Sequence, residues 1–154
     1  MKMNFEALDP EARALGMLGI RIRGRDGETL EKLWDEPCRR NIYSASKSFT
    51  GVAVGIALRE GLLSLDEKLT EVFWDAMPEH PDENLARATV RDLLTMCLGQ
   101  EKAMLMGGQR PDYPDDWVRL CFQVPFVHVP GTVFCYNNAG PYLAGVLIER
   151  RCGC

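Results

Sequence analysis

Residues 41–61 read NIYSASKSFTGVAVGIALREG, and the motif S-x-x-K formed by Ser44 and Lys47 decides how the fold is interpreted. Apolar residues recur after it at three- and four-residue spacing, which predicts a helix from Ser44 to about Glu60, ended by Gly61. Lysine is unfavourable in a first helical turn, because the positive end of the helix dipole disfavours an ammonium by about 0.3–1 kcal/mol. A capping box would place Glu or Gln there. Helix formation alone therefore does not explain Lys47.

The predicted core face of this helix comprises five apolar residues: Phe49, Val52, Ala53, Ile56 and Ala57. Val54 and Leu58 widen the apolar surface, so we expect the helix to be buried on several sides. Glycine inside a helix costs about 1 kcal/mol relative to alanine. The four-residue spacing of Gly51 and Gly55 therefore predicts that another backbone packs closely against the helix.

Ser44 and Lys47 have a structural and a chemical interpretation. Serine at a helix start most often serves as an N-cap. Residues three apart share a helix face, so a neutral Lys47 would reach Ser44, take its proton and make its oxygen a nucleophile. The helix dipole and burial would lower the pKa of Lys47, and the N–H of Ser44 would donate to a developing oxyanion. The motif by itself does not separate the two interpretations.

The segments on either side predict a hairpin and a series of short helices. Residues 16–34 alternate apolar and polar side chains around the turn sequence GRDG, which is typical of a β-hairpin. The other expected elements are helices at 64–73 (capped by Ser64 or Asp66), 89–99 (from the N-cap Thr89 to Gly99), 115–123 and 138–153, loops at 77–84 and 99–114, and a turn with a strand or extended run at 129–136.

The predicted fold class is α+β, with residues 1–154 forming a single partial domain that has a hairpin region at 1–40 and a mainly helical region at 41–154. One hairpin is too small to cover the apolar faces of several helices. We therefore expect the chain to be a piece of a larger fold, or to be completed by a partner.

The composition is that of a soluble globular domain: 154 residues, 46% hydrophobic and 26% charged, with a net charge of −4. The negative charge argues against a nucleic acid or an anionic membrane as partner. No apolar run is long enough to span a bilayer. The first residues lack the apolar region of a signal peptide, which predicts a cytoplasmic protein.

The six cysteines are expected to be reduced thiols, because they are scattered along a chain without a signal peptide. The close-spaced pair in CGC at 152–154 lacks a second ligand pair, and both histidines lie far from it in sequence. A metal site is therefore not expected at this pair.

A second motif, Y-x-N, lies far along the chain at Tyr136, Asn137 and Asn138. In isolation, packing and turn formation explain such residues. Together with S-x-x-K, however, the surrounding sequence resembles the serine β-lactamase and penicillin-binding protein family, in particular its class C β-lactamase, D-alanyl-D-alanine carboxypeptidase and esterase branch. The blocks that carry the resemblance are, in family order, YSASKSFTGVAVGIALREGLLSLDEKL at 43–69, TVRDLLTMCLG at 89–99 and PGTVFCYNNAGPYLAGVLIE at 130–149.

The resemblance implies a role for four residues. Ser44 matches the acylated nucleophile and Lys47 its paired base. Tyr136 matches the tyrosine that shuttles a proton to the serine or the leaving group. Asn138 matches the asparagine that hydrogen-bonds the lysine and the substrate amide. The implied activity is acyl transfer from a small-molecule amide or ester to Ser44, without a cofactor.

The sequence departs from the family in one respect: the third motif, K-T-G or H-x-G, is not present. Relatives continue through several strands, so the resemblance implies the helical half of the fold, truncated before those strands. The leading hypothesis is a serine hydrolase acting on a β-lactam, a D-Ala peptide or a small ester. The alternative is a non-catalytic remnant or interaction module. Faces left exposed by truncation would favour a homo-oligomer.

Overall fold

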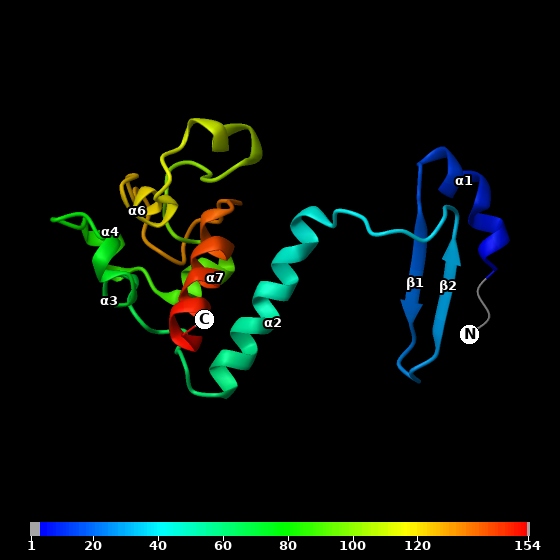
Figure 1. Ribbon diagram of the computed structural model, residues 1–154, viewed down its shortest axis with the longest axis horizontal. Helices are drawn as coiled ribbons and strands as arrows, with labels where there is room; N and C mark the ends of the chain where they lie inside the picture. The colour runs from blue at the N-terminus through cyan, green and yellow to red at the C-terminus, as the bar shows by residue number, and fades with distance from the viewer. Residues whose placement is uncertain (1–3, 154) are drawn as a thin grey trace. The chain divides into compact units, whose positions relative to one another are not determined.

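The computed structural model describes residues 4–153. The chain divides into two compact units, one up to Asn41 and one from Ile42 onward, and each is described by itself (Figure 1). All four residues of the predicted site belong to the second unit.

The first unit holds the predicted hairpin. Its strands are antiparallel, with Gly19 opposite Leu33 and Ile22 opposite Leu30. The indole of Trp34 ties the preceding helix to the hairpin by donating a 2.7 Å hydrogen bond to Asp9. The elements are η1 (Phe5–Leu8), α1 (Asp9–Ala14), β1 (Gly19–Arg23) and β2 (Thr29–Leu33).

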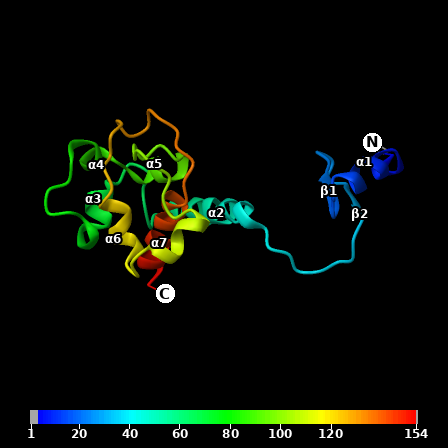
Figure 2. The ribbon, with the colours of Figure 1, turned by 90° about the horizontal axis from the view of Figure 1, so that it is seen from above.

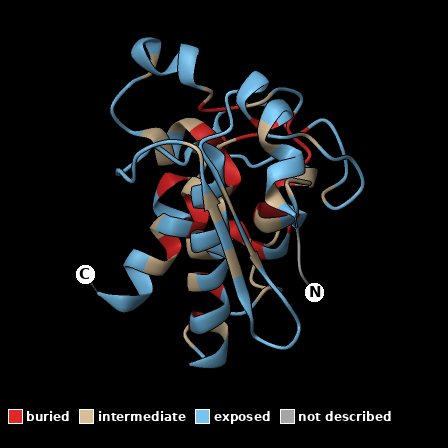
Figure 3. Ribbon diagram, turned by 90° about the vertical axis from the view of Figure 1, so that its right-hand side faces the viewer, coloured by how far each residue is buried: buried red, intermediate tan, exposed pale blue. Residues whose placement is uncertain are grey.

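The second unit is helical. Its hydrophobic core includes the interface where α7 (Ala139–Cys152) packs against α2 (Ser46–Arg59) and α5 (Val90–Thr95), and it extends to the segments between these helices (Figures 1 and 2). The buried segments of this core appear in red in Figure 3. Its largest fully buried side chains include Phe73, Phe122 and Leu143. The elements are η2 (Tyr43–Ala45), α2 (Ser46–Arg59), α3 (Leu69–Val72), η3 (Trp74–Ala76), α4 (Glu83–Arg87), α5 (Val90–Thr95), η4 (Gly107–Asp112), α6 (Trp117–Phe122) and α7 (Ala139–Cys152).

Helix α2 buries a different face from the predicted one. Val54 and Ala57 are buried, whereas Phe49, Val52 and Ile56 are 68%, 63% and 43% exposed. The physical reason is that α7 packs against α2, and the other described segments of the helical unit leave the predicted face uncovered. Ideal Cβ atoms on Gly51 and Gly55 would likewise meet nothing within 4 Å.

Two helix ends also differ from prediction. Thr89 and Asp92 form the capping box of α5, as the N-cap prediction required, but the helix ends at Met96 rather than Gly99. Met96 adopts a left-handed conformation with φ 56°, which stops the helix three residues early. Helix α3 begins later than predicted: its N-cap is Lys68, and neither Ser64 nor Asp66 caps it.

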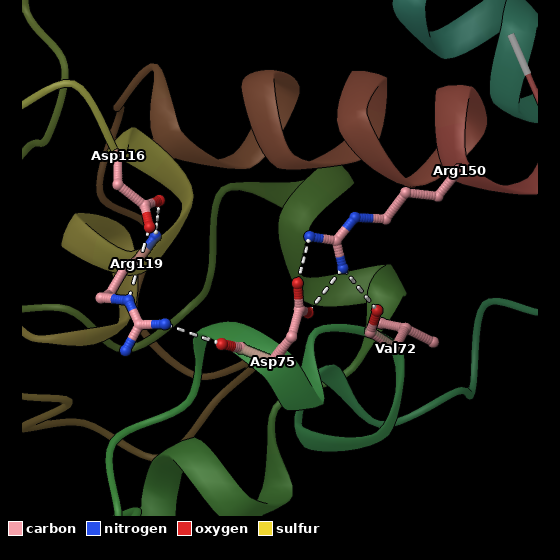
Figure 4. Close-up of polar contacts among 5 residues, drawn as sticks. All are labelled: Val72, Asp75, Asp116, Arg119 and Arg150. Carbon is pink, nitrogen blue, oxygen red and sulfur yellow. Dashed lines mark hydrogen bonds and ion pairs between the residues drawn. The ribbon is translucent and has the colours of Figure 1, made fainter.

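An ion pair joins the end of α7 to the turn η3 (Figure 4). The guanidinium of Arg150 donates to both carboxylate oxygens of Asp75, at 2.8 and 3.0 Å, and lies over the ring of Phe73. Arg119 of α6 donates to the backbone carbonyl of Asp75 at 2.9 Å. Chiefly because of its hydrogen bonds with Arg150, the pKa of the Asp75 carboxyl lies below its ordinary 3.8. This contact fixes three elements of the helical unit together.

The thiols differ in their surroundings. Cys121 is fully buried, and burial raises its pKa to about 12, whereas Cys38 and Cys152 are exposed. Cys154, the last residue of the CGC sequence, lies outside the described residues. Within residues 4–153, no group of three His, Cys, Asp or Glu side chains has the arrangement of a metal site. The same range contains no helix long and apolar enough to cross a membrane.

Candidate active site

Ser44 lies in the short turn η2, one turn ahead of α2, rather than at the N-cap of that helix. The N-cap position is Ala45, and no side chain caps the helix start. Tyr43, immediately before the serine, has φ 45°, an uncommon backbone conformation for a residue other than glycine. Ser44 is exposed. The structural interpretation of Ser44 as a helix cap is therefore incorrect.

Two side chains converge on the hydroxyl of Ser44. Lys47 Nζ donates a hydrogen bond to Ser44 Oγ at 3.1 Å, as expected for residues three apart at a helix start. The phenolic hydroxyl of Tyr136 donates to the same oxygen at 2.6 Å. Lys47 Nζ also lies 5.2 Å from the centre of the Tyr136 ring. The structure thus brings together three of the four predicted residues.

Tyr136 is electrostatically perturbed by this arrangement. Its hydrogen bond with Ser44 is the largest cause that lowers its pKa below the ordinary 10.0, followed by its hydrogen bond with Lys47, and the charge of Lys47 adds to them. Desolvation acts in the opposite direction. Since the tyrosine stays 41% exposed, it keeps access to solvent and to a small molecule.

Within residues 4–153, the side-chain amide of Asn138 makes no hydrogen bond with Lys47. Its side-chain amide donates instead to the backbone carbonyl of Leu105 at 2.8 Å and lies 3.7 Å from the sulfur of Met106. Leu105 has a positive φ of 57°, and the Asn138 hydrogen bond helps to hold this strained residue in place. The asparagine therefore positions the wall of the site, while its hydrogen bond to the lysine stays a prediction.

Asn137 has a structural role that the sequence interpretation missed. Its side chain is only 1% exposed, and its Oδ1 accepts a 3.0 Å hydrogen bond from the backbone N–H of Gly140 in the first turn of α7. Its amide group donates to the carbonyl of Cys135 at 3.2 Å. Asn137 stands one residue before Asn138, the N-cap residue of α7, and the preference for asparagine at helix starts could have indicated a capping role for one of the two.

A pocket of about 250 Å³ adjoins the converging side chains. It contains Lys47 and Asn138, so it lies one side chain away from the Ser44 hydroxyl. Apolar and aromatic side chains make up much of its wall. Its lining residues are Ser46, Lys47, Thr50, Leu105, Arg110, Trp117, Asn138, Pro141 and Tyr142.

Comparison with known proteins identifies the family of this chain. The profile of the family described as "Beta-lactamase" matches residues 22–153, and the chain belongs to this family. The family resemblance inferred from S-x-x-K and Y-x-N is therefore confirmed.

The region aligned with individual relatives makes up most of this chain but only a minor part of each relative. "Probable fimbrial assembly protein FimD, serogroup H1" of Dichelobacter nodosus is 30% identical over 133 residues, which are 83% of this chain and 33% of that protein. The chain thus spans about a third of the length of the curated relatives it matches.

Solved structures show the same relationship. A beta-lactamase/D-alanine carboxypeptidase from Pseudomonas syringae aligns with a TM-score of 0.76 at 20% identity, covering 96% of this chain and 44% of that one. A crystal structure of SurE aligns with a TM-score of 0.69 at 26% identity, covering 96% of this chain and 34% of that one. These alignments confirm the predicted α+β fold class, with the hairpin and the helical half present.

Proposed function

We propose that this chain carries the acylation machinery of a serine hydrolase, which transfers the acyl group of an amide or ester to Ser44. The observation that carries the proposal is the convergence of Lys47 and Tyr136 on the Ser44 hydroxyl. A serine becomes an effective nucleophile when a positioned base lies within hydrogen-bond reach of it. Both neighbours satisfy this distance requirement.

In the proposed acylation step, the phenolate of Tyr136 accepts the proton of Ser44 while Oγ forms a bond to the substrate carbonyl carbon. The electron pair of the carbonyl bond moves onto its oxygen, where the N–H of Ser44 would stabilise it. The adduct then collapses: the carbonyl re-forms, the bond to the leaving amine or alkoxide breaks, and Tyr136 returns its proton to that group.

Deacylation repeats this sequence with water. The Tyr136 phenolate takes a proton from water while the water oxygen attacks the carbonyl carbon of the acyl-enzyme ester. The bond between that carbon and Ser44 Oγ then breaks, and Tyr136 returns the proton to Oγ. The products are a carboxylic acid and the original hydroxyl. Lys47 supports both steps, because its positive charge beside the ring favours the phenolate form of Tyr136.

A second candidate function is a non-catalytic binding module. The position of Asn138 favours it, because this side chain is bonded to Leu105 rather than to Lys47. A module of this kind would keep the pocket and its ligand while lacking a reactive serine. Covalent labelling of Ser44 therefore separates the two functions.

The test is intact-mass measurement of the 154-residue chain after exposure to a fluorophosphonate and, separately, to a fluorescent penicillin. We expect one adduct from at least one reagent in the unmodified protein and in the Ser48→Ala variant. Ser48 is a matched control, since it is an exposed serine on α2, whereas Lys47 and Tyr136 both donate to Ser44. The Ser44→Ala variant should give no adduct.

The binding-module function would be favoured if neither reagent added mass to the folded chain. Labelling that persisted in Ser44→Ala would also overturn the proposal, because it would place the nucleophile elsewhere. Circular dichroism of each variant confirms that a missing adduct does not reflect an unfolded protein.

A further inference from the structure

Arg110 is fixed in place at the edge of the pocket beside Lys47 and Asn138. Its Nε donates a 3.2 Å hydrogen bond to the backbone carbonyl of Leu105, the carbonyl that also accepts from Asn138. Its guanidinium carbon lies 6.0 Å from the centre of the Trp117 ring. Trp117 in turn contacts Tyr142 edge-on, with ring centres 5.8 Å apart. The guanidinium is therefore held by contacts on two sides.

Arg110 also differs from the other arginines of the helical unit in having no acidic partner. The unit contains seven arginines, and the other six each form an ion pair with a carboxylate: Arg59, Arg87, Arg91, Arg119, Arg150 and Arg151. Asp116, an acid near Arg110 in sequence, is paired with Arg119 and caps α6. Over residues 4–153, Arg110 makes no salt bridge, and its two terminal nitrogens donate no hydrogen bond.

The free side of this guanidinium has the geometry that suits a carboxylate. Nε is already used by Leu105, so the two terminal amino groups remain with parallel N–H bonds. Such a pair binds both oxygens of a carboxylate at once, and arginine is favoured over lysine for this purpose. An unpaired cation in a partly apolar pocket therefore indicates an anionic ligand group.

The pocket limits how large that ligand group is. Its volume of about 250 Å³ falls just below the roughly 300–1,000 Å³ of sites for drug-sized molecules. Leu105, Trp117 and Tyr142 offer apolar and aromatic surface to a short carbon chain. Lys47 lies in the same pocket and contacts Ser44 Oγ, so an acyl group attached to the serine is next to this space.

We propose that the pocket receives the acyl portion of the substrate and that Arg110 selects short acyl groups ending in a carboxylate. This inference rests on the proposed acylation of Ser44 and adds the substrate class. Ser44 forms its ester with one carbonyl of the acyl group, while the distant carboxylate binds the terminal amino groups of Arg110. Arg110 is a specificity-determining residue and takes no part in proton transfer.

The test compares two esters with the same number of acyl carbons: p-nitrophenyl pentanoate, which is neutral, and mono-p-nitrophenyl glutarate, which ends in a carboxylate. Nitrophenolate release gives the acylation rate constant, with the Ser44→Ala rate subtracted, and intact mass confirms the adduct. We expect the glutarate-to-pentanoate ratio to fall about tenfold in Arg110→Gln, since one charge-assisted contact is lost. Added salt should lower the ratio in the unmodified protein but not in Arg110→Gln.

Arg59→Gln is the matched control, because it removes the same charge from an exposed site at the far end of α2. Its ratio should equal that of the unmodified protein. An unchanged glutarate-to-pentanoate ratio in Arg110→Gln, whether or not both rate constants fall, would overturn the selection of carboxylates while leaving acylation of Ser44 intact. If neither ester nor the fluorophosphonate modified Ser44, the proposed function and this inference would both be wrong.

Discussion

The phenolic oxygen of Tyr136 lies 2.6 Å from Ser44 Oγ, although 92 residues separate the two in sequence. Backbone hydrogen bonds on either side of the tyrosine hold it there: Cys135 N–H donates to Met96 and Asn138 N–H donates to Met104. These bonds tie the extended segment before α7 to the segment that follows α5. The phenolic hydroxyl of Tyr136 is thus positioned by the packing of the helical unit and not by its local sequence alone.

Tyr136→Phe should slow fluorophosphonate labelling of Ser44 by about 10²-fold, because a positioned base typically contributes 10²–10⁴-fold. In the unmodified protein, the pKa of Tyr136 lies below 10.0, so its phenolate fraction grows at lower pH than for an ordinary tyrosine. The labelling rate should therefore rise with pH and level off below the range of a free tyrosine. Rates measured between about pH 6 and pH 10 check this profile.

The variant should lack that rise altogether. Tyr113→Phe is the control, since its hydroxyl bonds Gln109 and it lies outside the pocket. A Tyr136→Phe protein with the unmodified rate and pH profile would show that the tyrosine is not the base.

The sequence predicted those parts of the fold that depend on local chemistry. Alternating side chains specified the hairpin, the spacing of Ser44 and Lys47 placed both groups at one helix start, and Thr89 was recognisable as an N-cap. Tyr136 is different, because no periodicity relates it to Ser44. Only the family resemblance connected them before the structure was known.

Properties that depend on packing between distant segments could not be predicted. Helical periodicity gave α2 an apolar face, but which face is covered depends on where α7 lies. The end of α5 was missed because Met96 takes a conformation that is typical of glycine. Arg110 was assigned to a loop, and its lack of a carboxylate partner is visible only in three dimensions.

Asn137→Ala should lower the free energy of unfolding by about 1–2 kcal/mol, because it leaves the Gly140 N–H at the start of α7 without its partner. Urea unfolding measures the loss. Asn138→Ala is the comparison: this side chain makes no capping hydrogen bond, so its removal should cost less stability and should instead slow labelling of Ser44. Equal stability losses in the two variants would contradict the separate roles of the two asparagines.

Gly140→Ala should destabilise the helical unit by about 1–3 kcal/mol, because the new methyl group would overlap the backbone carbonyl of Leu93 and push α5 away from α7. Gly145→Ala in the same helix is the matched control. A Cβ there meets nothing within 4 Å, so the substitution should stabilise the protein by up to about 1 kcal/mol. Thermal unfolding of both variants tests the close approach of Gly140 to Leu93. Similar melting temperatures of the two variants would refute it.

Asp75→Asn should lower the free energy of unfolding at neutral pH by about 1 kcal/mol, since the lost ion pair with Arg150 is half-exposed and screened by solvent. The folded protein holds the pKa of Asp75 below 3.8, so the stabilisation is complete well above that value and is lost as the pH falls through the folded-state pKa. The melting temperatures of the variant and the unmodified protein should therefore converge in acid.

Thermal unfolding between about pH 7 and pH 3 follows this convergence. Glu79→Gln serves as the control, because Glu79 is exposed and makes no ion pair within residues 4–153. Its melting temperature should match that of the unmodified protein at neutral pH. If Asp75→Asn behaved like this control at neutral pH, the bond between α7 and η3 would be a surface contact without effect on stability. A difference that persisted in acid would instead assign the loss to packing around Phe73 and not to charge.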